Sequence, residues 1–267
     1  MGGSCKRAAT PCRKRGHKLD KRSPADRHAI VMSRIMIIRL AAALSVLTAL
    51  SLAVSSATTA SAKPVILAPS DRAGDTLAVF YSGDGGWGPL DSKVAGRLAA
   101  DGVPTVGINS LAYFSTGRSP QAVADDLATD LRDYERQWGR SKVTLIGYSF
   151  GADALPAIIP RLPSDLRAQI GHVVLIGTGP HGDLRFHPAS WLNLAPSDSF
   201  PVSPAIAALP RLTMGDVKIT CVYGDKERAD ICPTLPDTEV AKIRLPGGHH
   251  FNGDYAALGE AVLRASR

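Results

Sequence analysis

The segment Lys142–Ala152 constrains the fold of this chain more than any other part of the sequence. It reads Lys-Val-Thr-Leu-Ile-Gly-Tyr-Ser-Phe-Gly-Ala, so an apolar, β-branched run leads into Gly-x-Ser-x-Gly and a helix-compatible stretch follows. A strand, a sharp turn and a helix of this kind hold a serine in strained geometry with its hydroxyl exposed at the end of a sheet. Gly147 and Gly151 suit that turn because a Cβ there would collide with the neighbouring strand and helix. We therefore predict that Ser149 is a nucleophile.

Strand-like and helix-like segments alternate along the rest of the chain, which predicts an α/β fold with a mostly parallel sheet of about six strands flanked by helices. The predicted strands span residues 76–82, 103–109, 142–148, 172–177, 218–224 and 240–245. The predicted helices lie at residues 94–100, 120–138, 150–159 and 255–265. Residues 179–210 are rich in Pro, Ser and Asn, so we expect a long irregular loop or lid there rather than a core element.

The basic charge belongs to the N-terminus. Residues 1–39 hold eleven Lys and Arg against two Asp, so removing this +9 from the formal charge of +7 leaves −2 for the rest. The apolar run after Arg39 and the small residues that end at Ala62 are typical of a secretory signal peptide cleaved near Ala62, with a retained anchor as the alternative. We expect residues 1–62 to be a basic extension plus this signal, residues 63–267 to be one exported domain, and nucleic acid not to be a partner.

The side chains that would activate Ser149 are expected on loops after later strands, in the chain order serine, acid, histidine. After the fifth predicted strand, Asp225 and Asp230 compete for the acid role, and we prefer Asp230 because its Asp-x-Cys-Pro context resembles a common turn at this place. After the sixth predicted strand, His249 and His250 compete for the role of base. We prefer His250, because an aromatic residue follows it.

An ester oxyanion needs backbone N–H donors. We expect one from Phe150 and a second from Asp84 or Gly85, in the glycine-rich loop after the first predicted strand. Cys221 and Cys232 are predicted to form a disulfide that ties the acid loop to its strand, since an exported protein meets an oxidising compartment. Cys5 and Cys12 match no zinc-binding spacing, so no metal is expected.

Three motifs taken together resemble the bacterial virulence protein VirJ/AcvB family: Ser-Gly-Asp-Gly-Gly-Trp (82–87), Gly-Tyr-Ser-Phe-Gly-Ala-Asp (147–153) and Pro-Gly-Gly-His-His-Phe-Asn-Gly-Asp-Tyr (246–255). The resemblance implies an α/β-hydrolase fold and a periplasmic location. It also implies hydrolysis of an aminoacylated phospholipid of the lysyl-phosphatidylglycerol type, or an association with type IV secretion. We expect the protein to be of a shorter type, without the additional N-terminal domain of the longer AcvB-type members.

From these features we expect a periplasmic serine hydrolase that needs no cofactor, acts on an aminoacyl lipid or another ester, and contacts the outer leaflet of the inner membrane. The alternatives are a binding or chaperone-like partner of secretion-system proteins, and a general carboxylesterase or thioesterase. A cationic acyl group would be recognised by carboxylates, for which Asp84, Asp153 and Asp254 are candidates. A lipid would contact aromatic side chains, for which Trp87, Tyr113 and Phe114 are candidates.

Overall fold

The computed structural model of the protein describes residues 65–186, 199–212 and 217–267. A seven-stranded sheet has the order β1 (Val65–Ala68), β3 (Thr105–Ile108), β2 (Thr76–Tyr81), β4 (Lys142–Tyr148), β5 (Ile170–Ile176), β8 (Lys218–Gly224), β9 (Ala241–Leu245). β1 is antiparallel to β3 and all other neighbours are parallel. A separate two-stranded sheet joins β6 (His181–Gly182) and β7 (Phe200–Pro201). The predicted mostly parallel sheet is confirmed.

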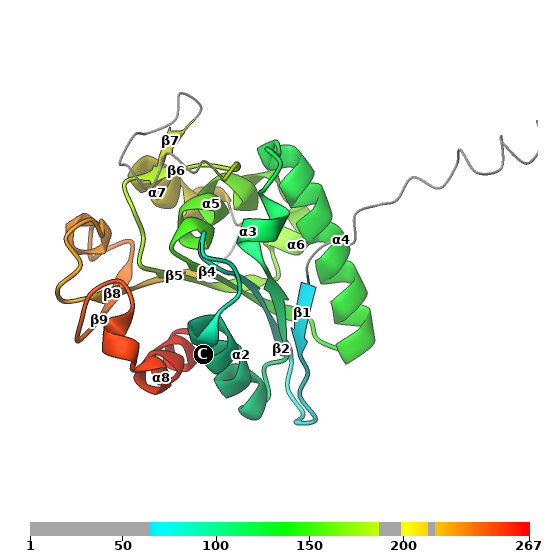
Figure 1. The fold of residues 1–267 in the computed structure, drawn as a ribbon. Helices are drawn as coiled ribbons and strands as arrows, with labels where there is room; N and C mark the ends of the chain where they lie inside the picture. Colours follow the sequence, from blue (N-terminus) through cyan, green and yellow to red (C-terminus); the bar gives the residue numbers. More distant parts are fainter. Residues whose placement is uncertain (1–64, 187–198, 213–216) are drawn as a thin grey trace, which may run out of the picture. The chain divides into compact units, whose positions relative to one another are not determined.

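Helices cover both faces of the large sheet (Figure 1). One face packs against α2 (Pro89–Ala100) and α8 (Tyr255–Ala265). The other face packs against α3 (Ser110–Tyr113), α4 (Pro120–Trp138), α5 (Phe150–Ile158), α6 (Ser164–Arg167) and α7 (Val202–Leu212). Three short 3₁₀ turns complete the described elements: η1 (Ile159–Arg161), η3 (Cys232–Thr234) and η4 (Phe251–Gly253).

The sequence of strand β2 is a continuous apolar run because both of its faces are buried. Leu77, Val79 and Tyr81 point into the core beneath α4 and α5, whereas Ala78 and Phe80 point into the core beneath α2 and α8. All five residues are buried, because a parallel strand between two helical layers has no solvent-facing side.

Helix α4 begins and ends where its sequence requires. The Ser119 hydroxyl accepts a hydrogen bond from the N–H of Ala122 at 3.1 Å, and Pro120 occupies the first turn. Gly139 ends the helix in the left-handed conformation, with φ of 64°. The helix predicted over residues 120–138 is therefore confirmed.

The sequence did not predict β1 and α7, nor the short helices α3 and α6 and the two-stranded sheet of β6 and β7. β1 is a seventh strand, whose four residues at the sheet edge are too few to give a clear pattern. Residues 179–210 were expected to be irregular, which is wrong for their last part, because helix α7 begins at Val202. Val202, Ile206 and Leu209 are all buried, and their helical spacing is the signal that the Pro-rich surroundings obscured.

Residues Lys63–Arg267 form one compact unit. The predicted signal segment, at residues 1–62, lies outside the described residues. Within the described ranges, no helix is long and apolar enough to span a membrane.

Candidate active site

Ser149 lies at the turn between β4 and α5, with φ of 51° and ψ of −117°. A non-glycine residue rarely adopts a positive φ, and such strain persists only where the surrounding structure enforces it. A Cβ added to Gly147 would lie 2.5 Å from the backbone nitrogen of Ala152, and one added to Gly151 would overlap the carbonyl oxygen of Tyr81. The sharp turn predicted from the glycine spacing is confirmed.

The histidine that reaches Ser149 is His249. Its Nε2 lies 2.9 Å from the Ser149 Oγ, and its ring stacks on that of Tyr148 with 5.2 Å between the centroids. The preferred candidate His250 instead places its Nδ1 2.9 Å from the Tyr148 hydroxyl, so its predicted pairing with Ser149 is wrong. The aromatic residue that follows His250 is buried in the core beside α8 and does not decide which imidazole faces the serine.

The carboxylate beside His249 is Glu227, whose Oε2 lies 3.5 Å from the imidazole Nδ1. Glu227 is on the loop after β8, where an acid was expected, but only the two aspartates of this loop were considered. The available signal was its position three residues beyond Gly224, because glutamate replaces aspartate in some serine triads.

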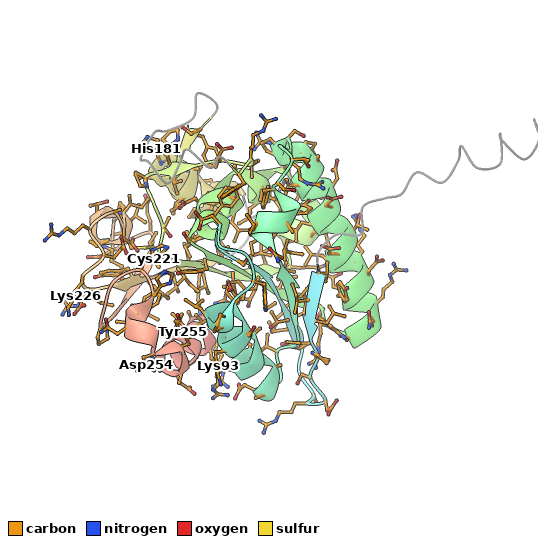
Figure 2. The ribbon with its side chains drawn as sticks, viewed as in Figure 1. Lys93, His181, Cys221, Lys226, Asp254 and Tyr255 are labelled. Carbon is orange, nitrogen blue, oxygen red and sulfur yellow. A yellow bond between two sulfur atoms is a disulfide. The ribbon has the colours of Figure 1, made fainter. Side chains whose placement is uncertain are left out.

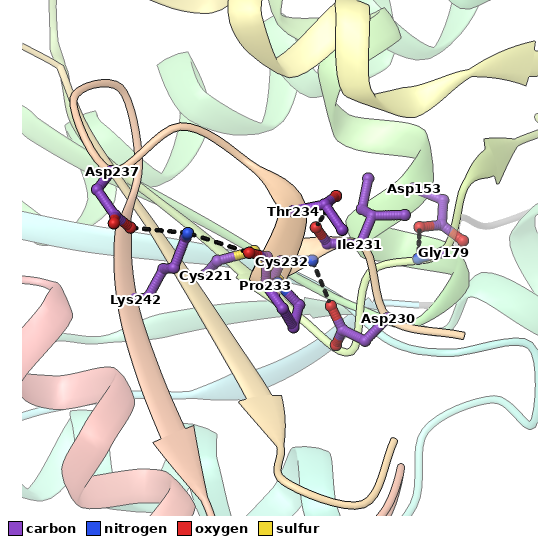
Figure 3. Close-up of a disulfide and its surroundings, with 10 residues drawn as sticks. All are labelled: Asp153, Gly179, Cys221, Asp230, Ile231, Cys232, Pro233, Thr234, Asp237 and Lys242. Carbon is purple, nitrogen blue, oxygen red and sulfur yellow. Dashed lines mark hydrogen bonds and ion pairs between the residues drawn. A yellow bond between two sulfur atoms is a disulfide. The ribbon is translucent and has the colours of Figure 1, made fainter. Parts of the chain in front are cut away.

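The two predicted acids hold loops in place. Asp225 accepts a hydrogen bond from the N–H of Gly247 at 2.8 Å, which joins the acid loop to the histidine loop. Asp230 is buried and accepts from the N–H of Cys232 at 2.7 Å (Figure 3). The preference for Asp230 as the partner of the histidine is therefore wrong in this structure.

The electrostatics of His249 favour a neutral imidazole. Burial lowers its pKa and the neighbouring His250 lowers it further, while the Glu227 carboxylate opposes both effects. With Nδ1–H toward Glu227, the Nε2 lone pair faces the serine hydroxyl. His249 is therefore placed to accept the Ser149 proton.

The loop that follows β2 lies directly beside Ser149. A Cβ added to Gly83 would lie 3.4 Å from the Cβ of Ser149. The loop turns through a hydrogen bond from the N–H of Gly86 to the carbonyl oxygen of Gly83 at 3.1 Å. Phe150 begins α5, where helix geometry leaves the first N–H groups without an intrahelical acceptor.

A pocket of about 400 Å³ opens over Ser149. It is lined by the glycine-rich loop, the start of α2 and the histidine loop: Gly83, Asp84, Gly85, Gly86, Gly88, Pro89, Leu90, Asp91, Tyr148, Ser149, His249, His250 and Tyr255. The lining includes Asp84 and Gly85, whose role as oxyanion donors stays a prediction. It also includes Asp91 and Tyr255, which sequence reasoning missed because both belong to helix starts.

Five of the residues predicted to contact the substrate do not line this pocket. Trp87 donates from Nε1 to the Ser92 Oγ at 3.0 Å, and its ring packs edge-on against Phe80. Tyr113 and Phe114 are buried in the core.

Two of the carboxylates predicted to recognise the acyl group accept hydrogen bonds from backbone N–H groups instead. Asp153 accepts from the N–H of Gly179 at 2.7 Å, and burial raises its pKa well above the ordinary value (Figure 3). Asp254 caps α8 by accepting from the N–H of Ala257 at 3.0 Å, and Figure 2 places it at the start of that helix, beside Tyr255.

The predicted disulfide between Cys221 and Cys232 is confirmed, with the two Cα atoms 5.8 Å apart. Asp230 lies close to both sulfur atoms. These three residues are not a metal site, because sulfurs bonded to each other are not thiolate ligands.

Residues 75–267 match the family described as bacterial virulence protein (VirJ). The chain belongs to this family. No curated protein sequence matches the chain.

Solved structures share the fold of this VirJ-family protein. Est1E from Butyrivibrio proteoclasticus with bound ferulic acid is 13% identical, with a TM-score of 0.50 over 75% of this chain and 92% of that one. The esterase domain from a Rhodothermus marinus protein is also 13% identical, with a TM-score of 0.50 over 75% of this chain and 89% of that one. These likenesses and the strand order identify the α/β-hydrolase fold.

Proposed function

We propose that this protein is a serine hydrolase that cleaves esters through Ser149, His249 and Glu227. The observation that supports this most directly is the 2.9 Å contact between the His249 Nε2 and the hydroxyl of a serine held at positive φ. A serine alcohol becomes nucleophilic when a positioned base takes its proton and a third group orients that base.

In the proposed mechanism, His249 accepts the Ser149 proton as Oγ attacks the ester carbonyl carbon. The N–H of Phe150 and an N–H of Asp84 or Gly85 stabilise the resulting oxyanion. His249 then gives the proton to the departing alcohol, which leaves an acyl-enzyme. Water, deprotonated by His249, attacks the acyl carbon; His249 then returns this proton to the Ser149 Oγ as the acyl–oxygen bond breaks and the acid is released.

We further propose that the natural ester carries a positively charged acyl group, as in an aminoacylated phospholipid of the lysyl-phosphatidylglycerol type. In the described part of the chain, the pocket lining includes no Lys or Arg but includes the carboxylates of Asp84 and Asp91. Asp91 is only 2% exposed, and among the residues that the structure describes no group donates to its Oδ1. Such a pocket attracts a cation and disfavours an anionic acyl group.

The proposed site of action is the periplasm, at the outer leaflet of the inner membrane. A disulfide at Cys221–Cys232 supports an oxidising compartment, and the predicted signal segment supports export.

A fluorophosphonate probe tests the hydrolase proposal. The wild-type protein is expected to label covalently, and Ser149→Ala to lose labelling completely. His249→Ala should slow labelling by about 10²- to 10⁴-fold, the usual contribution of a general base. A protein that only binds secretion-system components would not label.

Vesicles test the substrate. We expect release of lysine from lysyl-phosphatidylglycerol vesicles by wild type but not by Ser149→Ala. Equal or faster turnover of soluble short-chain esters or thioesters would favour a general esterase instead, and failure to release lysine would exclude the lipid substrate.

A further inference from the structure

The hydroxyl of Tyr148 lies between two groups of the histidine loop. It is 3.2 Å from the backbone carbonyl oxygen of His249 and 2.9 Å from the Nδ1 of His250. Tyr148 immediately precedes the nucleophile at the end of β4, whereas the two histidines lie on the loop after β9, about 100 positions further along the chain.

The two contacts determine the tautomer of His250. A phenol hydroxyl has one proton, and a carbonyl oxygen can only accept a hydrogen bond. Both contacts are satisfied together when Tyr148 donates to the His249 carbonyl and accepts from an Nδ1–H of His250. A neutral imidazole protonated at Nδ1 has an unprotonated Nε2, which is a hydrogen-bond acceptor.

This acceptor belongs to the pocket of the proposed nucleophile. His250 is exposed and lines the pocket with Ser149 and His249. Two carboxylates of the described residues line this pocket with it, Asp84 on the loop after β2 and Asp91 on α2, and Glu227 on the loop after β8 contacts the adjacent His249. All three are carboxylates, so the Nε2 acceptor of His250 lies in an acidic environment.

We propose that His250 is a specificity residue, whose Nε2 accepts a hydrogen bond from a protonated amine of the substrate. The inference rests on the proposed ester hydrolysis and assigns the second histidine a role distinct from that of the base. A protonated amine fits better than a phosphate, because it donates hydrogen bonds and because the surrounding carboxylates attract it. A substrate hydroxyl would also donate but would gain nothing from those charges.

Two amide substitutions test the roles of the two ring nitrogens of His250 separately. In His250→Asn, the amide N–H takes the place of Nδ1–H toward Tyr148, but no acceptor reaches the position of Nε2. In His250→Gln, the longer side chain places its amide oxygen near the position of Nε2. Asn should therefore lose amine recognition and Gln should restore it.

Three esters of equal size provide the readout: methyl L-alaninate, methyl L-lactate and methyl propionate, which differ only in an amine, a hydroxyl or a hydrogen at the α-carbon. The measured quantity is the ratio of kcat/KM for alaninate to that for propionate at neutral pH. In His250→Asn this ratio should fall about ten-fold or more, the effect of one charge-assisted hydrogen bond. His250→Gln should stay within about three-fold of wild type, because one acceptor is retained.

An unchanged ratio in His250→Asn would overturn the proposal, as would an equal loss in His250→Gln. A lactate-to-propionate ratio that falls as much as the alaninate ratio would show that the recognised group is a hydroxyl. If wild type neither hydrolyses these esters nor releases lysine from lysyl-phosphatidylglycerol vesicles, the proposed function fails separately from the role of His250. The role of His250 is then decided by ligand-observed NMR binding of alaninamide, lactamide and propionamide to wild type and His250→Asn, with the same expected order.

Discussion

Replacing Glu227 with Gln tests which carboxylate supports the base. The substitution keeps the shape of the side chain and removes the charge that stabilises the imidazolium formed when His249 takes the Ser149 proton. It is expected to lower kcat/KM for ester hydrolysis and leave the fold intact, because Glu227 lies on an exposed loop outside the core.

The magnitude follows from the 3.5 Å between the Glu227 Oε2 and the His249 Nδ1. At this distance, two unit charges attract by about 1 kcal/mol in bulk water and about 5 kcal/mol at an effective dielectric constant of about 20. Since about 1.4 kcal/mol corresponds to ten-fold in rate, the limits are roughly 5-fold and a few thousand-fold. The Glu227 side chain is 18% exposed and that of His249 34%, so we expect an intermediate loss of about 100-fold.

The pH dependence gives a second readout with a definite sign. The Glu227 carboxylate raises the pKa of His249 against the lowering by burial, so its removal lowers that pKa further. The base works when deprotonated, and activity is lost as pH falls through its pKa. The acidic limb of kcat/KM should therefore move to lower pH in Glu227→Gln.

Asp225→Asn and Asp230→Asn are the matched controls, because each asparagine keeps an oxygen that can accept the existing backbone hydrogen bond. Initial rates with a soluble ester, measured across pH for all four proteins, complete the assay. The reasoning is refuted if Asp230→Asn loses more activity than Glu227→Gln and is the variant whose acidic limb moves.

Three further predictions concern stability. Gly147→Ala places a Cβ 2.5 Å from backbone atoms of α5, so the free energy of unfolding measured by urea titration should fall by about 3 kcal/mol or more. In the matched control Gly96→Ala, the new Cβ meets no atom within 4 Å in the interior of α2, so the free energy of unfolding should rise by about 0.5–1 kcal/mol. Replacing Cys221 and Cys232 together by Ala opens a loop with a sequence separation of 11 and should lower the free energy of unfolding by about 3 kcal/mol; no change would show that the bridge does not constrain the unfolded chain. Burial raises the pKa of Asp230 from 3.8 to about 6, so the folded protein binds this proton more tightly than the unfolded chain does. The free energy of unfolding should therefore fall as pH rises from about 4 to about 6, and Asp230→Asn should flatten that slope.

The parts of the fold that local chemistry determines were predictable from the sequence. The glycines at positions 147 and 151 specify the turn at Ser149, since any side chain there meets backbone atoms. Apolar runs identified six of the seven strands of the large sheet, and the order serine, acid, histidine placed the site at the carboxyl ends of β4, β8 and β9. The Cys221–Cys232 bridge was predictable because it joins a strand to the loop that follows it.

The choice between neighbouring side chains was not predictable in the same way. His249 and His250 are adjacent, and their directions depend on how the turn after β9 meets the Tyr148 hydroxyl, a contact between residues about 100 positions apart. Glu227 was missed because its carboxylate is brought to His249 by the path of the whole loop. Neither hydrophobic periodicity nor motif spacing contains this information.

The aspartates predicted to carry out chemistry explain how the site keeps its geometry. Asp225 ties the acid loop to the histidine loop, and Asp153 ties α5 to the loop after β5 through Gly179. Asp230 orders the turn at Cys232, where the disulfide fixes the same loop to β8. Burial raises the pKa of Asp153 and Asp230, so ionising these carboxylates in the folded state costs free energy. A proton transfer that depends on a 2.9 Å contact between two loops requires such anchoring, because a small displacement of either loop would separate Ser149 from its base.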